Sequence, residues 1–307
     1  MIITPNMPKN VIRRHKARGV SLIELMIGLV IGIILALAAS TVYLYSKQSF
    51  NSTSETSQLE ENGRFAINLL TRYIQGAGYV VIDPAIPFPQ GPIDTKVRGC
   101  DLGFVNPTTP TSASDLACAT STSAGARMSA GIAVFNQTDA YNASGAAYQG
   151  FDCVGLSSTN IITTTGSVNE TRSYFFVSST TAQTPTGVIT VGQLSCVSDR
   201  TNSAGVASFQ AQPLIPGIEQ IAFRYLLPAA VDPDTAQVPT TAASMPASPS
   251  WPGVLAVELC VLGKSIQSAG NDSGTQYLDC YENAITAAPG EIYRTFRTTV
   301  RLRNKSV

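Results

Sequence analysis

Side chains suited to catalysis are scarce in this chain of 307 residues. His15 is the single histidine, so a Ser-His-Asp or Cys-His arrangement, a histidine metal site or a histidine general base would depend on it alone. The phosphate-binding pattern Gly-x-x-x-x-Gly-Lys-Ser/Thr is absent, and no Gly-x-Gly-x-x-Gly follows an expected strand. We therefore predict that the protein is not an enzyme and has no cofactor and no metal site.

Two groups of acidic residues could still bind calcium or act as a carboxylate pair. They are Asp232-Pro233-Asp234 and the combination of Asp272 with Asp279. Both lie in segments rich in Pro, Gly or Ser or beside a cysteine, a context typical of solvated turns. We favour turns over a catalytic or calcium site.

The six cysteines are even in number, and none belongs to a Cys-x-x-Cys pair. This pattern fits disulfides formed in an oxidising compartment better than a zinc ribbon or a thioredoxin-like site. Six cysteines allow 15 connectivities, and proximity in the sequence suggests one of them. The suggested pairs are Cys100–Cys118, Cys153–Cys196 and Cys260–Cys280.

Charge is strongly segregated at the N-terminus, although the whole chain has 20 basic and 20 acidic residues. Residues 1–19 contain 5 Lys and Arg and no acid, and the run Leu25–Tyr45 has 21 residues without charge. Such a run can span a membrane as a helix, with its basic flank in the cytoplasm. Glu24 stands at the start of the run, where a carboxylate needs a partner or a function.

Two general interpretations of this segment are open. In a secretory signal peptide, Leu35–Ser40 would supply the cleavage site, but Glu24 would have no role. In a simple single-pass anchor, Glu24 would reach toward the lipid headgroups. Gly28 and Gly32 form a Gly-x-x-x-Gly that permits close helix contact, or they are merely tolerated small residues.

After a polar stretch from Ser46 to Asn62, apolar residues return at helical spacing. They lie mostly on one stripe, and Gly76-Ala77-Gly78 provides a stop. We expect one helix from about Val20 to about Gln75, apolar in its first half and amphipathic in its second. The stripe consists of Leu59, Ala66, Leu69, Leu70, Tyr73 and Ile74.

Beyond Gly78 the pattern predicts an antiparallel sheet with long loops, which gives an α+β fold. Two proline-rich segments, Asp83–Ala124 and Pro228–Pro252, are expected to be surface loops. Ile221, Phe223 and Tyr225 would share one sheet face. The expected strands are Gly131–Phe135, Phe151–Gly155, Thr171–Ser178, Gly187–Val191, Gly217–Leu227, Val254–Leu262 and Phe296–Arg303.

Alternation in the last strand places Arg297, Arg301 and Arg303 on one face and Arg294 on the other. Such a stripe could contact DNA, but the balanced charge argues against a nucleic-acid partner held by bulk positive charge. Charges that protect a sheet edge are the better interpretation. No specific nucleic acid is predicted.

The basic leader, Gly19, the four following residues, Glu24 and the apolar run together resemble the class III signal of type IV prepilins. The resemblance implies cleavage by a prepilin peptidase between Gly19 and Val20, N-methylation of Val20, and attraction of Glu24 to the terminal ammonium of a neighbouring subunit. Cleavage would remove His15 and leave a mature chain with about five net negative charges.

Several further segments resemble PilW-type minor pilins. They are Arg64–Tyr79 with its Ala-Gly-Tyr ending, Pro216–Tyr225, Trp251–Leu262, and Tyr293–Asn304 with its Leu-Arg-Asn ending. The resemblance implies a pilin-like fold in which a long helix packs on an antiparallel head. The expected divisions are a leader (1–19), a membrane or fibre-core helix (20–45), an amphipathic stem (46–78) and a disulfide-containing head (79–307).

The implied function is that of a minor pilin in the assembly or tip complex of a type IV pilus, with roles in twitching motility, adhesion and DNA uptake. The implied partners are the prepilin peptidase, other minor pilins, the major pilin and a tip adhesin. The chain would cross the bacterial inner membrane once, with its head in the periplasm, and then move to the cell surface. The alternatives are a minor pseudopilin of a type II secretion system and a membrane-anchored binding protein that never polymerises.

Overall fold

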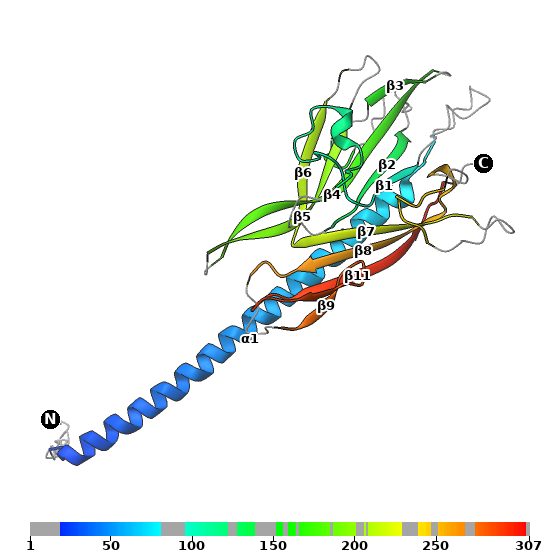
Figure 1. Ribbon diagram of the computed structural model, residues 1–307. Coiled ribbons are helices and arrows are strands. Elements are labelled where there is room, and N and C mark those ends of the chain that lie inside the picture. Colours follow the sequence, from blue (N-terminus) through cyan, green and yellow to red (C-terminus); the bar gives the residue numbers. More distant parts are fainter. Residues whose placement is uncertain are drawn as a thin grey trace, which may run out of the picture. The chain divides into compact units, whose positions relative to one another are not determined.

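The structure is a computed structural model of the chain (Figure 1). It describes residues 19–80, 96–121, 128–138, 152–155, 159–163, 166–184, 187–200, 206, 208–228, 239–246, 251–267 and 274–304. The leader up to residue 18, with His15, lies outside these ranges, as do Asp232, Asp234 and Asp272. The expected divisions between leader, helix, stem and head stay predictions.

One helix, α1, runs from Leu22 to Gly76, close to the expected limits. The chain divides into two compact units at Ser49 and Phe50, which are described separately. In the first unit every described residue is exposed, including large apolar side chains such as Leu25, Ile31 and Leu35. This part of α1 is therefore an apolar helix without a protein environment of its own.

In the second unit, α1 buries a narrow stripe against the head. Its buried residues recur every three or four positions, the period of one helix face. They are Glu55, Leu59, Gly63, Ala66, Leu70 and Ile74, and the expected Leu69 and Tyr73 lie partly buried at the edge of the stripe. The helix stops before Gly78, whose φ of 72° favours glycine.

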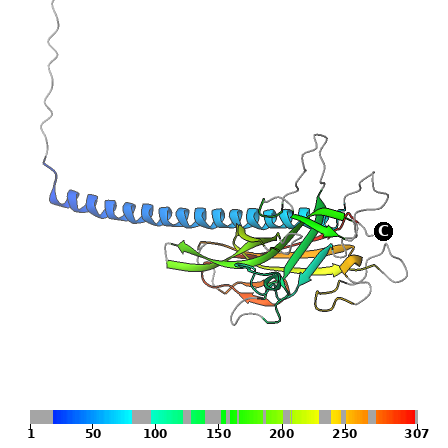
Figure 2. The ribbon, with the colours of Figure 1, turned by 90° about the horizontal axis from the view of Figure 1, so that it is seen from above.

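The larger sheet has six antiparallel strands in the order β1-β2-β4-β5-β6, with β3 paired to β4. Its strands are β1 (Val97–Cys100), β2 (Gly131–Thr138), β3 (Thr159–Thr163), β4 (Gly166–Thr184), β5 (Gly187–Asp199) and β6 (Phe209–Pro216). The strands lie together on one side of the second half of α1 (Figure 2).

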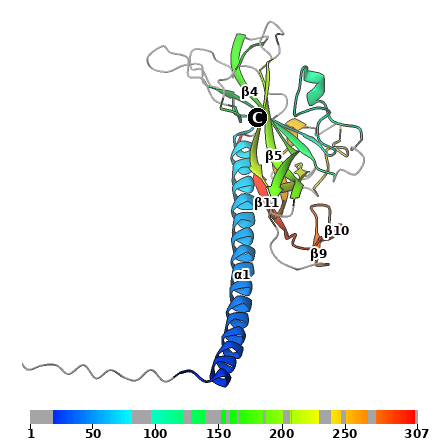
Figure 3. The same ribbon diagram turned by 90° about the vertical axis from the view of Figure 1, so that its left-hand side faces the viewer.

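A second antiparallel sheet has the order β11-β8-β7 and is formed by β7 (Ile218–Leu226), β8 (Ala256–Lys264) and β11 (Tyr293–Arg301). A small hairpin of β9 (Gln276–Leu278) and β10 (Ala284–Thr286) lies on the side of β11 away from α1 (Figure 3). The α+β class with a helix packed on antiparallel sheets is confirmed.

The main core lies between α1 and the inner faces of both sheets. Leu70 and Ile74 from α1 meet Phe175 of β4 and Ile221 of β7 there. Phe223 and Tyr225 join the same core, so the predicted face of β7 is confirmed. A second cluster around Tyr174 and Phe176 covers the outer face of the larger sheet, and a third around Cys260 and Tyr293 lies under the β9–β10 hairpin.

Two local predictions were wrong. Residues 152–155 form a turn and not a strand, because the Asp152 carboxylate accepts a hydrogen bond from the Val154 amide (3.0 Å) and Gly155 has a φ of 78°. The segment expected to be a loop from Asp83 to Ala124 contains β1 and a short 3-10 helix, η1 (Ala113–Leu116). The other expected strand segments correspond to β2, β4, β5, β7, β8 and β11.

Candidate functional site

The first candidate site is the N-terminal end of α1. Gly19 and Val20 are exposed and non-helical, so the peptide bond between them is accessible. Glu24 lies in the first helical turn, where a carboxylate is favoured by the helix dipole. No ion pair of Glu24 occurs within the described residues.

The following apolar stretch is long and apolar enough to cross a membrane. Gly28 and Gly32 are one helical turn apart and share a face, and no atom of the described residues would meet a Cβ at either position. The face they form is flat and uncovered. The arrangement thus combines an accessible peptide bond, a lone carboxylate and an apolar helix.

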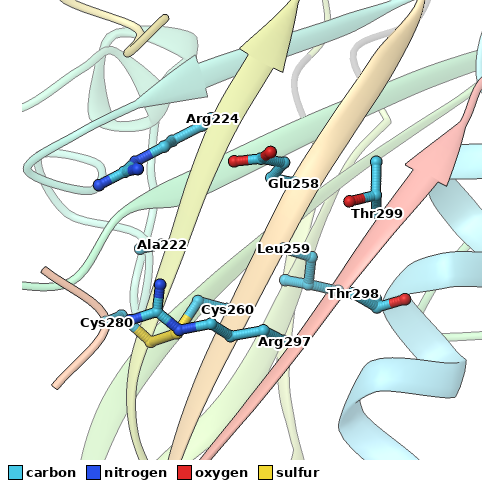
Figure 4. Close-up of a pocket in the computed structure, with 9 residues that line it drawn as sticks. All are labelled: Ala222, Arg224, Glu258, Leu259, Cys260, Cys280, Arg297, Thr298 and Thr299. Atoms are coloured by element: carbon cyan, nitrogen blue, oxygen red, sulfur yellow. A yellow bond between two sulfur atoms is a disulfide. The ribbon is translucent and has the colours of Figure 1, made fainter. Parts of the chain in front are cut away.

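The second candidate is a hollow of about 330 Å³ on the outer face of the three-stranded sheet. Register places Arg224, Glu258 and Thr299 in one row across β7, β8 and β11, and Ala222, Cys260 and Arg297 in the next (Figure 4). The Cys260–Cys280 disulfide lies at the hairpin end of the hollow.

The charged residues that line this hollow are two arginines, Arg224 and Arg297, and one glutamate, Glu258. Arg297 donates to the Asp279 main-chain oxygen (3.2 Å) and lies 3.7 Å from a carboxylate oxygen of Glu282. Glu258 and Arg224 form no ion pair with any described residue. A surface of this kind can bind an anionic or mixed-charge segment.

The carboxylate of Asp279, a candidate calcium ligand, has a structural role. It accepts hydrogen bonds from the amides of Tyr281 and Asn283 (2.8 Å each) and from the Asn283 side chain (3.2 Å). Burial opposes its ionisation, but these donors together with Gln220 outweigh burial and lower the pKa of Asp279. Its oxygens hold the β9–β10 turn, but the residue is buried, whereas a solvated turn was predicted.

Residues 14–40 match the prokaryotic N-terminal methylation motif, and residues 174–304 match the type IV pilus-assembly protein W family, PilW. Over these two segments the chain is similar to type IV prepilin-like proteins of the PilW type. No curated protein and no solved structure matches it.

The methylation-motif match spans Gly19, Val20, Glu24, Gly28 and Gly32. The PilW match begins within β4 and extends past β11, so it includes the three-stranded sheet and the hollow. Of the larger sheet it includes the second part of β4 together with β5 and β6, whereas β1, β2 and β3 precede it. The resemblance noted for Pro216–Tyr225, Trp251–Leu262 and Tyr293–Asn304 falls inside the match, whereas Arg64–Tyr79 precedes it.

The last residue of the PilW match, Asn304, contacts the C-terminal end of α1. The Asn304 side-chain amide donates to the main-chain oxygens of Gly76 (3.2 Å) and Ala77 (3.1 Å). These are carbonyls that a helix end leaves without intrahelical partners. The sequence showed both segments but gave no sign that they meet, because the contact joins positions more than 200 residues apart.

All six cysteines are paired in the structure. The pairs Cys100–Cys118, Cys153–Cys196 and Cys260–Cys280, with Cα–Cα distances of 5.1, 6.3 and 5.6 Å, are those that sequence proximity suggests. Each distance lies in the normal disulfide range. The first pair links β1 to the segment after η1, and the third links β8 to the β9–β10 hairpin.

Proposed function

We propose that this protein is a minor pilin of a type IV pilus, which acts in the assembly-initiating or tip complex. The observation that carries the proposal is the lone carboxylate of Glu24 inside the matched methylation motif, at the start of the uncharged and exposed apolar run of α1 (Leu25–Tyr45). The helix would hold the chain in the inner membrane, and prepilin peptidase would cut after Gly19.

Cleavage would create an ammonium group at Val20, later methylated. A charge removed from water requires a partner, and breaking a buried pair costs about 3–5 kcal/mol. In a fibre whose core consists of such helices, Glu24 of one subunit would compensate the N-terminal ammonium of its neighbour. This gives the carboxylate a function that a simple anchor lacks.

We propose that the head belongs to a surface-exposed subunit and has no catalytic role. The compact unit from Phe50 onward, to which the head belongs, contains three disulfides, which suits the periplasm and the cell surface. Its bulk favours a tip position over a repeated position in the shaft. The other minor pilins, the major pilin and a tip adhesin are the proposed partners, and motility, adhesion and DNA uptake are the proposed roles.

The test is the substitution Glu24→Ala in the full chain, with Glu61→Ala as the matched control. Glu61 lies on the same helix, is exposed and has no ion pair within the described residues. We expect the E24A protein to be cut after Gly19 and to remain in the membrane, while its amount in sheared pili falls at least about a hundredfold. The E61A protein should enter pili normally.

Normal amounts of the E24A protein in sheared pili would contradict the proposal. Mass spectrometry should show methylated Val20 as the mature N-terminus, and any other N-terminus would remove its premise. If loss of the gene abolishes protein secretion while surface pili stay unchanged, the protein is a pseudopilin of a secretion system.

A further inference from the structure

Strand β11 is an edge of the three-stranded sheet and is paired on one side only, to β8. Just outside the strand, the Leu302 amide and the Ile292 carbonyl point to the β8 side, through hydrogen bonds to Leu255 and Ser265 (2.9 Å each). Since main-chain groups alternate sides along a strand, even-numbered residues face β8 and odd-numbered residues face outward.

The outward groups therefore belong to Thr295, Arg297, Thr299 and Arg301. Within the described residues, none of their main-chain amides or carbonyls has a hydrogen-bond partner. The pairing with β8 is regular over nine residues, without a bulge. The edge is thus a long, straight row of unused donors and acceptors.

Every other edge strand in the described part of the chain has a feature that opposes strand addition, although β4 after Phe175 and β5 before Gln193 also extend beyond their neighbours β2 and β6. β6 contains Pro213 and Pro216 and faces a register shift in β5, and β7 is covered by a bridge to Thr240 and by Ser129 and Ala130. The remaining edge strands, β1, β3, β9 and β10, have only three to five residues. Natural proteins protect edges by such means.

The arginines on β11 are exposed, but ion pairs engage two of them, and the edge-guarding interpretation stays a prediction. Arg294 pairs with Glu60 of α1 on the inner face, and Arg297 is engaged by Asp279 and Glu282. Of the three exposed arginines on β11, only Arg301 has no ion pair among the described residues. Between Arg297 and Arg301 the edge reads Thr-Thr-Val, which favours strand pairing.

Side-chain charge indicates what kind of strand the edge fits. An added strand would place alternate side chains on the outer face beside Arg297, Thr299 and Arg301, next to the hollow that contains Arg224. The Glu258 carboxylate is the one acid among the lining residues. Opposite charges across neighbouring strands stabilise pairing, so an acidic residue fits opposite Arg301.

We propose that the β11 edge binds an extended, acidic segment of a different pilus subunit, which adds to the sheet as a fourth strand. Main-chain hydrogen bonds would provide affinity, and carboxylates facing Arg301 and the hollow would provide selectivity. The choice of a pilus subunit rests on the proposed function, whereas the added strand and its acidity rest on the edge itself.

The test uses the full chain co-expressed with the other prepilin-like proteins of the same cell and extracted in detergent. Hydrogen exchange is compared, residue by residue, between the isolated protein and the complex. The amides of Thr295, Arg297, Thr299 and Arg301 should exchange fast in the isolated protein and at least about tenfold more slowly in the complex. The even-numbered amides, already bonded to β8, should change little.

The variant Thr299→Pro removes one outward donor without breaking the β8 pairing, because proline is tolerated at an edge. We expect it to weaken the complex at least about tenfold, whereas Thr299→Ala, which keeps the amide, should bind normally. Arg301→Glu should also weaken the complex, and added salt should weaken binding of the wild-type protein more than that of R301E.

The inference is overturned if no complex forms, if the odd-numbered amides are not protected, if T299P binds as T299A does, or if a second copy of this chain occupies the edge. A failure of the proposed minor-pilin function would be detected by different measurements. It would appear as a mature N-terminus other than Val20 or as normal pilus entry of the E24A protein, and neither result depends on β11.

Discussion

Gly192 of β5 lies where the two sheets meet, and its replacement by alanine should destabilise the head. The Gly217 amide donates to the Gly192 carbonyl (2.9 Å), and the Gly192 amide donates to the Glu219 carboxylate (2.9 Å). A Cβ on Gly192 would meet the Ile218 carbonyl oxygen and would lie 2.9 Å from the Cα of Glu219. These are backbone atoms, so the contact cannot be relieved by rotating a side chain.

Two opposing effects determine the magnitude. Overpacking of this kind costs about 1–3 kcal/mol. The same substitution reduces the entropy of the unfolded chain and so adds about 0.4–1 kcal/mol of stability. The steric cost is larger, and the free energy of unfolding of the G192A protein should fall by about 1–2 kcal/mol.

Trp251, the single tryptophan, gives a direct assay because its ring packs on Tyr225 with a centroid distance of 4.9 Å. Its fluorescence should follow urea unfolding of the full chain in detergent, which gives the free energy of unfolding. In a thermal unfolding experiment with the same signal, the melting temperature of G192A should drop by roughly 2–6 °C. Gly76→Ala is the control, since no described atom would meet its Cβ and helix propensity favours alanine. A G192A protein as stable as the wild type would refute the steric argument.

Two further substitutions concern the β9–β10 hairpin. Replacing both Cys260 and Cys280 by serine should reduce the free energy of unfolding by about 3 kcal/mol, because the bridge closes a short loop in the unfolded chain. Urea unfolding without reductant measures this change. An unchanged urea midpoint would contradict the prediction. The lowered pKa of Asp279 means that the unfolded state binds a proton first on acidification. The stabilisation that ionised Asp279 contributes should be complete above the ordinary carboxyl pKa of about 4 and should be lost as the pH falls through the lowered value. The difference in unfolding free energy between the wild type and Asp279→Asn should therefore shrink in acid. A difference that stays constant with pH would exclude this role.

The sequence predicted the parts of the fold that have a strong local signal. The apolar run and the stripe through Leu59, Leu70 and Ile74 predict α1 to within two residues at each end. By contrast, Asp152 and Gly155 have the types and spacing of a turn, and the apolar character of the neighbouring residues hid that signal. β9 and β10 are too short for an alternating pattern to be recognised.

The candidate sites also differ in whether their residues are close together in the sequence. Gly19, Val20 and Glu24 are close in the sequence, so their spacing alone identifies them. The hollow could not be found this way, because Arg224, Glu258 and Thr299 come together only through strand register. Glu55 is a similar case: its burial depends on the Gln267 amide, which donates to it (3.0 Å) from 212 positions away.

The three disulfides follow one another along the chain without overlapping, with separations of 18, 43 and 20 residues. In a chain that enters an oxidising compartment from its N-terminal side, the second cysteine of each bridge emerges before the first cysteine of the next. Sequential oxidation during export would therefore produce the native pairing directly. Correct bridging then needs an oxidant but no isomerase to rearrange wrongly joined cysteines.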